Sequence, residues 1–229
     1  MRFLFTFLFV SSAIICQAQS RNFWFGVNGT AQFNTFEYMT GILVQGQGEG
    51  APKANWTGFG VSARMENESK WSFLMGVNYA MESFNVEFVF TPTQPNDPFI
   101  PVTTEVIYSY LDIPLEASYQ ITKDAKFEFL AFGGLNYSAL LTTQEDSKMM
   151  DDSEKETTYF GEYKPVSLLQ LKMGVQARYS FADQFRVSLN PYVGYGLIQN
   201  TETYGKKEPF AYGFTLLLEY GRGKTSSSE

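Results

Sequence analysis

The side chains that most often carry out catalysis or bind metals are almost missing from this chain. It has no histidine, and its single cysteine, Cys16, lies in the apolar N-terminal segment. Thiolate and imidazole metal sites are therefore excluded for the rest of the chain, as are Ser-His and Cys-His nucleophile pairs and a disulfide framework. Carboxylate, lysine, tyrosine, serine and threonine chemistry remains, but no pair of carboxylates has the spacing of a known acid–base motif. We expect no catalytic group, no metal site and no cofactor.

Charged side chains nevertheless recur at positions that alternate with apolar residues. Four acidic and four basic residues fall on the polar side of their segments: Arg64, Asp112, Glu116, Glu128, Lys172, Arg178, Arg186 and Glu219. If that side faces inward, these charges must pair or be neutralised. The simplest interpretation is a salt-bridge plug that fills and stiffens the interior. A gated polar path, a small-ligand site and an enzymatic carboxylate pair are the alternatives.

The elements that position these charges follow a period-two alternation of apolar and polar residues from Asn22 to Tyr220. It predicts eight strands, at residues 23–34, 56–65, 71–81, 108–119, 127–141, 168–179, 185–197 and 210–220. Each is about as long as a tilted strand needs to cross the hydrocarbon layer, roughly 9–11 residues. Long connections (35–55, 91–104, 142–165 and 199–209) alternate with short ones (66–70, 122–126 and 180–184). This order is typical of a membrane barrel with both termini in the periplasm.

Two observations predict which face of each strand points outward. No charged residue occupies the apolar face of any of the eight segments, and an Arg or Lys at mid-bilayer would cost about 2–4 kcal/mol there. The opposite face is rich in small residues such as Gly60, Gly134 and Gly174, which suit the narrow interior of an eight-stranded barrel. We therefore expect the large apolar residues outside and the small residues inside.

Aromatic residues gather where these strands meet the short connections or the C-terminus: Trp71, Tyr119, Phe127, Tyr179, Phe185 and Tyr220. Such sorting predicts an interfacial girdle on the periplasmic side. Aromatic residues that fill a soluble core would not sort to one edge.

Three features depart from simple alternation. Pro114 and Pro191 lie inside strands, where each removes a ladder hydrogen bond and suggests a bulge. The alternation also changes phase after Met81, so we expect residues 84–90 and 99–107 to form a hairpin above the membrane.

The N-terminus reads as a signal peptide over residues 1–18, with Arg2, an apolar run and a small-x-small site that predicts cleavage after Ala18. The alternative is a lipoprotein acylated at Cys16, but Ile15 is bulky for the usual lipobox. We expect a barrel over residues 19–220 and a disordered periplasmic tail over residues 221–229. The net charge of −7 excludes a nucleic-acid partner.

The segment Tyr110-Leu111-Asp112-Ile113-Pro114-Leu115 resembles the Tyr-Leu-Glu-Ile-Pro-Leu signature of the PorT-like outer-membrane β-barrel family. Residues 127–137, with Gly133-Gly134, resemble the next strand of that family. The resemblance implies an eight-stranded outer-membrane barrel. The founding member of the family is linked to type IX secretion, but this activity has no residue-level counterpart here.

The sequence thus predicts an all-β, eight-stranded antiparallel transmembrane up-and-down barrel in the bacterial outer membrane. Expected partners are outer-membrane lipid, the barrel-assembly machinery and a protein bound at the extracellular loops. A non-enzymatic barrel with interacting loops, accessory to secretion or envelope function, is the leading hypothesis. The first alternative is a small-solute channel or ligand-binding barrel. The second is a lipid-modifying enzyme, which the absence of histidine disfavours. The third is a soluble lipocalin-like carrier.

Overall fold

The computed structural model describes residues 22–37, 53–67, 69–90, 100–124, 126–149, 156–158, 167–198 and 206–221. The strands in these ranges are β1 (Asn22–Glu37), β2 (Lys53–Glu66), β3 (Trp71–Phe90), β4 (Ile100–Lys123), β5 (Phe127–Met149), β6 (Glu156–Thr158), β7 (Ser167–Ala182), β8 (Phe185–Ile198) and β9 (Lys206–Gly221). None of the described residues belongs to a helix that is long and apolar enough to cross a membrane. The predicted signal peptide, and all of the predicted tail except Gly221, lie outside the described residues.

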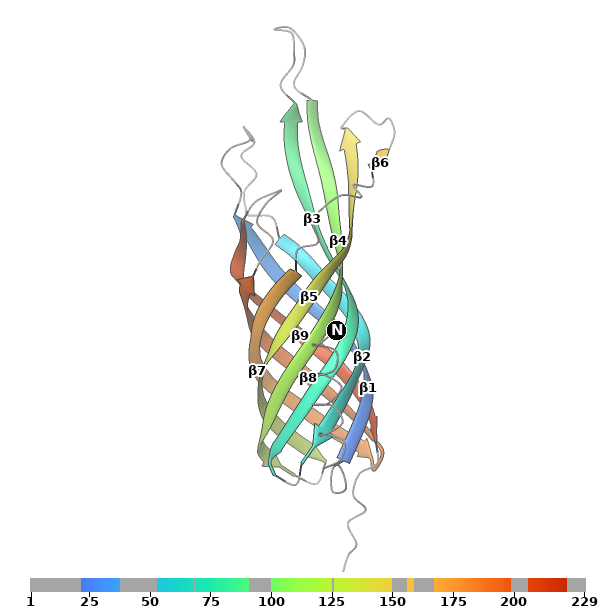
Figure 1. The fold of residues 1–229 in the computed structure, drawn as a ribbon, viewed down its shortest axis with the longest axis vertical. Helices are drawn as coiled ribbons and strands as arrows, with labels where there is room; N and C mark the ends of the chain where they lie inside the picture. Colours follow the sequence, from blue (N-terminus) through green and yellow to red (C-terminus); the bar gives the residue numbers. More distant parts are fainter. Residues whose placement is uncertain are drawn as a thin grey trace, which may run out of the picture.

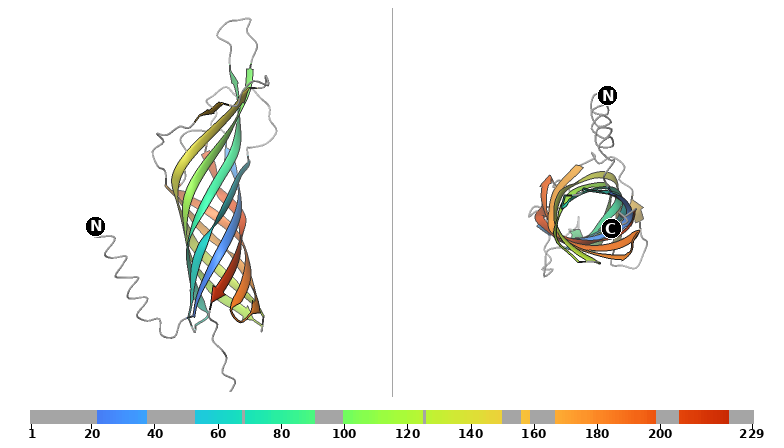
Figure 2. Two further views of the ribbon diagram at one scale, coloured as in Figure 1. Left: turned by 90° about the vertical axis from the view of Figure 1, so that its right-hand side faces the viewer. Right: turned by 90° about the horizontal axis from the view of Figure 1, so that it is seen from below.

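Eight of these strands form one closed antiparallel barrel (Figures 1 and 2). Each strand pairs with its neighbours in the order β4-β3-β2-β1-β9-β8-β7-β5, and pairing between β4 and β5 closes the ring. The first and last strands lie side by side, with Trp24 opposite Gly221. The short connections gather at one end of the tilted cylinder, and the short β6 pairs with the far end of β5. The predicted eight-stranded up-and-down barrel is confirmed.

The outward face of the barrel is apolar, as the alternation predicts. Phe129, Leu171 and Phe214 are 51%, 36% and 44% exposed, and the same pattern of exposure runs along every long strand. Had these three side chains packed in a dry interior, the membrane assignment would have failed. The predicted orientation is therefore correct.

Three neighbouring strands are much longer than the others. β3, β4 and β5 have 20, 24 and 23 residues, whereas the other barrel strands have 14 to 16. Their excess length continues beyond the barrel as a sheet of residues 84–90, 100–107 and 142–149, which we call the blade (Figure 1). The predicted hairpin is confirmed, because Phe84 pairs with Val106 and Phe90 with Ile100. The predicted loop over residues 142–165 is wrong at its start, where β5 continues to Met149.

The predicted bulges at Pro114 and Pro191 are also wrong. Pro114 falls where the β3–β4 ladder skips from Met75↔Leu115 to Asn78↔Asp112 without a change of register. At the periplasmic end of this ladder the Gln120 N–H donates to the Lys70 carbonyl over 2.8 Å. Even-numbered residues of β3 and β4 therefore exchange hydrogen bonds, and proline at 114 cannot donate. The missing hydrogen bond interrupts the β3–β4 pairing locally, but the register of the two strands stays the same on both sides.

Pro191 behaves in the same way between β7 and β8. The ladder passes from Gly174↔Tyr192 to Ala177↔Leu189 in constant register, so pairing is missing only at Pro191 and at the adjacent Asn190. On its other side Pro191 still pairs with Phe214 of β9. The register shifts that do occur lie elsewhere, for example between Ser109 and Tyr110 in the β4–β5 ladder.

The sequence led us to expect an interior lined by small and charged residues alone. The structure shows that large aromatic residues also point inward. Trp24, Phe132 and Tyr192 point inward and are 5–7% exposed. Each lies against a glycine on the adjacent strand: a Cβ built on Gly174 would sit 2.9 Å from the Phe132 ring. A Cβ on Gly213 would likewise sit 2.8 Å from the Tyr192 hydroxyl. Glycine thus provides the room that lets an aromatic ring fill the lumen.

Candidate functional site

A chain of buried ion pairs crosses the lumen near the short connections. The carboxylate of Glu219 on β9 accepts hydrogen bonds from Nε of Arg64 on β2 and from Nε of Arg186 on β8, each over 2.8 Å. All three side chains are at most 3% exposed. The Arg186 guanidinium also stacks on the Trp24 ring, 3.6 Å from its centroid. The first and last parts of the chain are therefore joined through the barrel interior.

A second carboxylate extends this chain to the opposite wall. Glu66, the last residue of β2, lies 2.8 Å from Nη1 of both Arg178 and Arg186. The same Nη1 of Arg178 lies 2.8 Å from Glu128 on β5. Three guanidiniums and three carboxylates thus balance in charge and connect β2, β5, β7, β8 and β9. Separating the charges of such a network would leave each buried charge unpaired, which is costly.

The other three predicted lumen charges lie around Lys172. Lys172 on β7 interacts electrostatically with Asp112 and Glu116 of β4. Its Nζ lies 4.6 Å from the centroid of the Tyr192 ring, and Asp112 is also hydrogen-bonded to Ser138. Glu116 interacts electrostatically with Arg64 and Glu219 as well. It therefore links the group of Asp112, Glu116 and Lys172 to the ion-pair chain of Arg64, Glu128, Arg178, Arg186 and Glu219.

A third polar layer was not predicted. The Asn34 amide donates to Glu82 over 3.1 Å and accepts from Gln32 over 3.1 Å. The hydroxyls of Tyr192 and Tyr110 donate to Gln32 and Glu82 over 3.0 and 3.4 Å. This layer joins β1, β3, β4 and β8 toward the blade end of the lumen.

Glu66 and Glu82 were missed because the predicted strands stopped one residue short of each. Glu66 was placed in a turn, and Glu82 fell just after the segment 71–81. The signal that could have found them is the continued alternation, since Glu66 follows Arg64, and Glu82 follows Asn78, at even spacing on the inward face.

An apolar cluster closes the lumen at the base of the blade, formed by Trp56, Ala80, Phe84, Val106, Tyr108, Tyr110 and Leu168. The Trp56 and Tyr110 rings stack with centroids 4.7 Å apart. The pocket beside it, lined in part by Gln32, Asn34 and Trp56, has a volume of about 30 Å³. Pockets for small organic ligands usually measure about 300–1,000 Å³, so this space does not suit one.

The six predicted girdle residues lie on the outer surface next to the short connections. They meet as three cross-strand pairs, with ring centroids 5.1 Å apart for Trp71–Tyr119, 4.7 Å for Phe127–Tyr179 and 5.0 Å for Phe185–Tyr220. Each pair occupies directly opposed positions in its ladder. Phe181, which the sequence analysis did not include, stacks on Phe185 at 5.9 Å.

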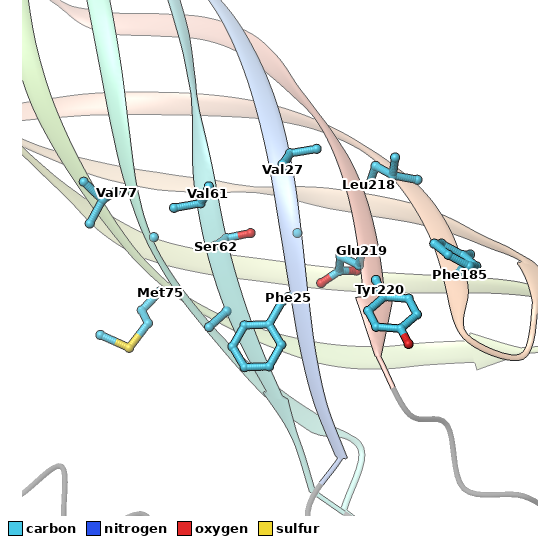
Figure 3. A pocket seen from close by; sticks show the side chains of 13 residues that line it. Phe25, Val27, Val61, Ser62, Met75, Val77, Phe185, Leu218, Glu219 and Tyr220 are labelled. Atoms are coloured by element: carbon cyan, nitrogen blue, oxygen red, sulfur yellow. The ribbon is translucent and has the colours of Figure 1, made fainter.

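A shallow groove of about 650 Å³ crosses the outer wall from β3 to β8, close to these aromatic pairs. Figure 3 shows Phe25, Val27 and Val61 projecting around it from β1 and β2. The small side chain of Ala63 and the backbone of Gly26 and Gly76 also line it. Such an apolar outer surface suits hydrocarbon chains rather than a soluble ligand.

A closed barrel with an apolar outer wall and a polar interior is the architecture of the transmembrane β-barrels of outer membranes. The chain matches the family described as outer membrane protein beta-barrel domain over residues 17–202. It therefore belongs to this family and is a bacterial outer-membrane protein. A search of curated proteins finds no match.

Several solved outer-membrane barrels have a similar structure. Neisserial surface protein A aligns over 86% of this chain and 96% of its own, with 11% identity and a TM-score of 0.41. The N-terminal barrel domain of OprF from Pseudomonas aeruginosa covers 86% and 98%, with 11% identity and a TM-score of 0.38. Ail of Yersinia pestis, solved with the heparin analogue sucrose octasulfate, covers 87% and 98%, with 12% identity and a TM-score of 0.38.

Proposed function

We propose that the protein is a non-conducting, non-enzymatic barrel that holds a rigid sheet outside the cell for binding another protein. The observation that supports this most is the contrast between a filled lumen and three strands that continue past it. Polar layers and an apolar cluster occupy the barrel interior. β3, β4 and β5 extend from this filled cylinder as the blade.

The base of the blade is anchored in the barrel. Phe84 of β3 and Tyr108 of β4 belong to the apolar cluster, with ring centroids 5.6 Å apart. Tyr108 in turn contacts Tyr110 at 6.3 Å. Because buried aromatic contacts of this kind hold an element in one orientation, the blade is a preorganised surface. Preorganisation lowers the entropic cost of binding.

The charges of the lumen serve stability rather than catalysis in this proposal. Glu219 and Glu66 each contact two guanidiniums, and a carboxylate held in this way is a poor general base because its negative charge is already satisfied. Outer-membrane lipid and the barrel-assembly machinery are the partners of the wall, and a second protein is the partner of the blade. The PorT-like segment at residues 110–115 extends the proposal to an accessory role in secretion or the envelope.

Two measurements test the proposal. The purified protein in planar lipid bilayers should show no conductance steps, whereas regular steps would support a channel and contradict the filled lumen. In intact cells, surface cross-linking should recover a partner that disappears when residues 86–104 are replaced by a short Gly-Ser turn. Replacement of residues 42–50 is the matched control and should leave the partner in place. Migration that changes on boiling verifies that each variant forms a barrel.

A further inference from the structure

The blade has an edge along β3 with which no described strand pairs. The ladder between β2 and β3 ends at Asn55↔Ser83. β3 continues to Phe90, and from Asn85 to Phe90 its pairing among the described residues is with β4 alone. We call the other side of residues 85–90 the open edge.

The backbone groups on the open side can be identified. The Asn67 N–H donates to the Trp71 carbonyl over 3.3 Å, so odd-numbered residues of β3 face β2. The register of β3 with β4 stays constant from Trp71 to Phe90, so this assignment holds along the whole strand. The N–H and C=O groups of Asn85, Glu87 and Val89 therefore point toward the open edge, and those of the even-numbered residues point toward β4.

The neighbouring part of the chain is poorly suited to cover this edge. If β2 continued backward in the same register, residues 48–53 would lie opposite residues 85–90. That segment contains Gly48, Gly50 and Pro52, residue types that are depleted in strands. Residues 84–90 themselves contain no lysine and no proline, two of the devices that protect an edge, and their one charged residue is Glu87.

A second copy of this chain is a poorer partner for the edge. Two barrels in one membrane have the same orientation, so their β3 strands run in the same direction. Two β3 edges could therefore pair only in parallel, which is less stable per residue than antiparallel pairing. The charge of the blade argues instead for a basic partner, because its described residues include Glu87, Glu105, Glu145 and Asp146, with Lys148 as the one basic residue among them.

We propose that the open edge of β3 binds an extended, basic segment of another protein as an added strand. The proposal rests on the function proposed above and names the kind of partner. Main-chain hydrogen bonds to Asn85, Glu87 and Val89 provide the affinity, as in other cases of strand addition. Electrostatic attraction by the acidic blade favours lysine-rich segments.

The test uses the full barrel in lipid nanodiscs and a fluorescent nine-residue peptide of alternating threonine and lysine. Anisotropy should show binding of this peptide. The same peptide with proline at its centre should bind at least about tenfold more weakly, the effect of losing one to two hydrogen bonds. A threonine–glutamate peptide keeps the main-chain hydrogen bonds but should also bind more weakly, because its charge is repelled by the acidic blade. Equal binding of the proline-containing peptide would overturn the proposal.

Substitutions at one position separate the edge from its charge. Glu87→Pro removes an N–H from the open side and leaves the β3–β4 hydrogen bonds intact, so peptide affinity should fall about tenfold. Glu87→Gln keeps the N–H and should lower affinity by about two- to threefold. Val89→Pro provides a second edge variant if Glu87→Pro fails to fold. An unchanged affinity in the folded proline variants would refute strand addition.

Failure of this inference can be told apart from failure of the proposed function. If replacement of residues 86–104 abolishes partner capture but Glu87→Pro does not, the blade binds through another surface and the edge proposal is wrong. Conductance, or capture that survives blade replacement, would contradict the proposed function itself. Disulfide-linked dimers of Glu87→Cys formed in the membrane would show that a second copy covers the edge, which would also overturn the proposal.

Discussion

Replacing Glu219 with glutamine tests whether the ion-pair network supports the barrel. Its carboxylate bridges Arg64 and Arg186 over 2.8 Å and is 1% exposed. Glutamine keeps the shape but removes the charge, so two buried guanidiniums lose a shared counter-ion. Removing one partner of a buried pair typically costs about 3–5 kcal/mol, and we expect a loss of this size in the free energy of unfolding.

The matched control is Glu128→Gln. Glu128 is 15% exposed, and its partner Arg178 keeps a second carboxylate, Glu66, at 2.8 Å. We therefore expect a smaller loss, about 1 kcal/mol, as for a hydrogen bond that is partly accessible to water. The difference between the two variants reflects both the deeper burial of Glu219 and the number of guanidiniums that lose a counter-ion.

The assay is urea unfolding in phospholipid vesicles, followed by tryptophan fluorescence and by migration of unboiled samples on gels. The double variant Arg64→Met/Glu219→Gln removes one charge of each sign and leaves Arg186 with Glu66. It should be more stable than Glu219→Gln alone. The reasoning is refuted if Glu219→Gln costs no more than Glu128→Gln, or if the second substitution makes the protein less stable still.

Three further predictions concern the wall, the lumen and the N-terminus. Leu216→Arg places a charge on the lipid face and should lower the free energy of unfolding in vesicles by about 2–4 kcal/mol, whereas an unchanged value would contradict lipid contact there. Gly174→Ala brings a methyl group against the Pro191 carbonyl and the Phe132 ring and should cost about 1–3 kcal/mol, measured by the same urea titration. Mass spectrometry of the exported protein should give Gln19 as the first residue; a chain that still begins at Met1 would contradict the predicted signal peptide.

The strands and their orientation could be predicted from the sequence because both are encoded locally. A strand exposes alternate residues to opposite surroundings, so the pattern around Phe129 or Leu171 identifies the lipid face without any knowledge of the partner strand. The long and short connections then order the strands into an up-and-down barrel. The hairpin at residues 84–90 was found for the same reason, since a change of phase is also a local signal.

The predicted ends of strands were wrong where the alternation of apolar and polar residues was weak. The end of β5, with Gln144, Glu145 and Asp146, resembles a solvated loop because it lies beyond the lipid and carries no apolar face to be recognised. Pro114 and Pro191 suggested bulges, but a bulge depends on the backbone of both strands. In the structure the strands keep the same register on both sides of each proline, so the missing N–H interrupts the pairing only locally.

The sequence by itself determined which residues face lipid and which face the lumen, because a period of two needs no information beyond the strand. Only the tertiary structure decided which inward residues meet. Arg64 and Glu219 are 155 positions apart, and their contact depends on strand tilt and on the register with which the barrel closes. Neither the tilt nor the register can be predicted from the sequence of a single strand.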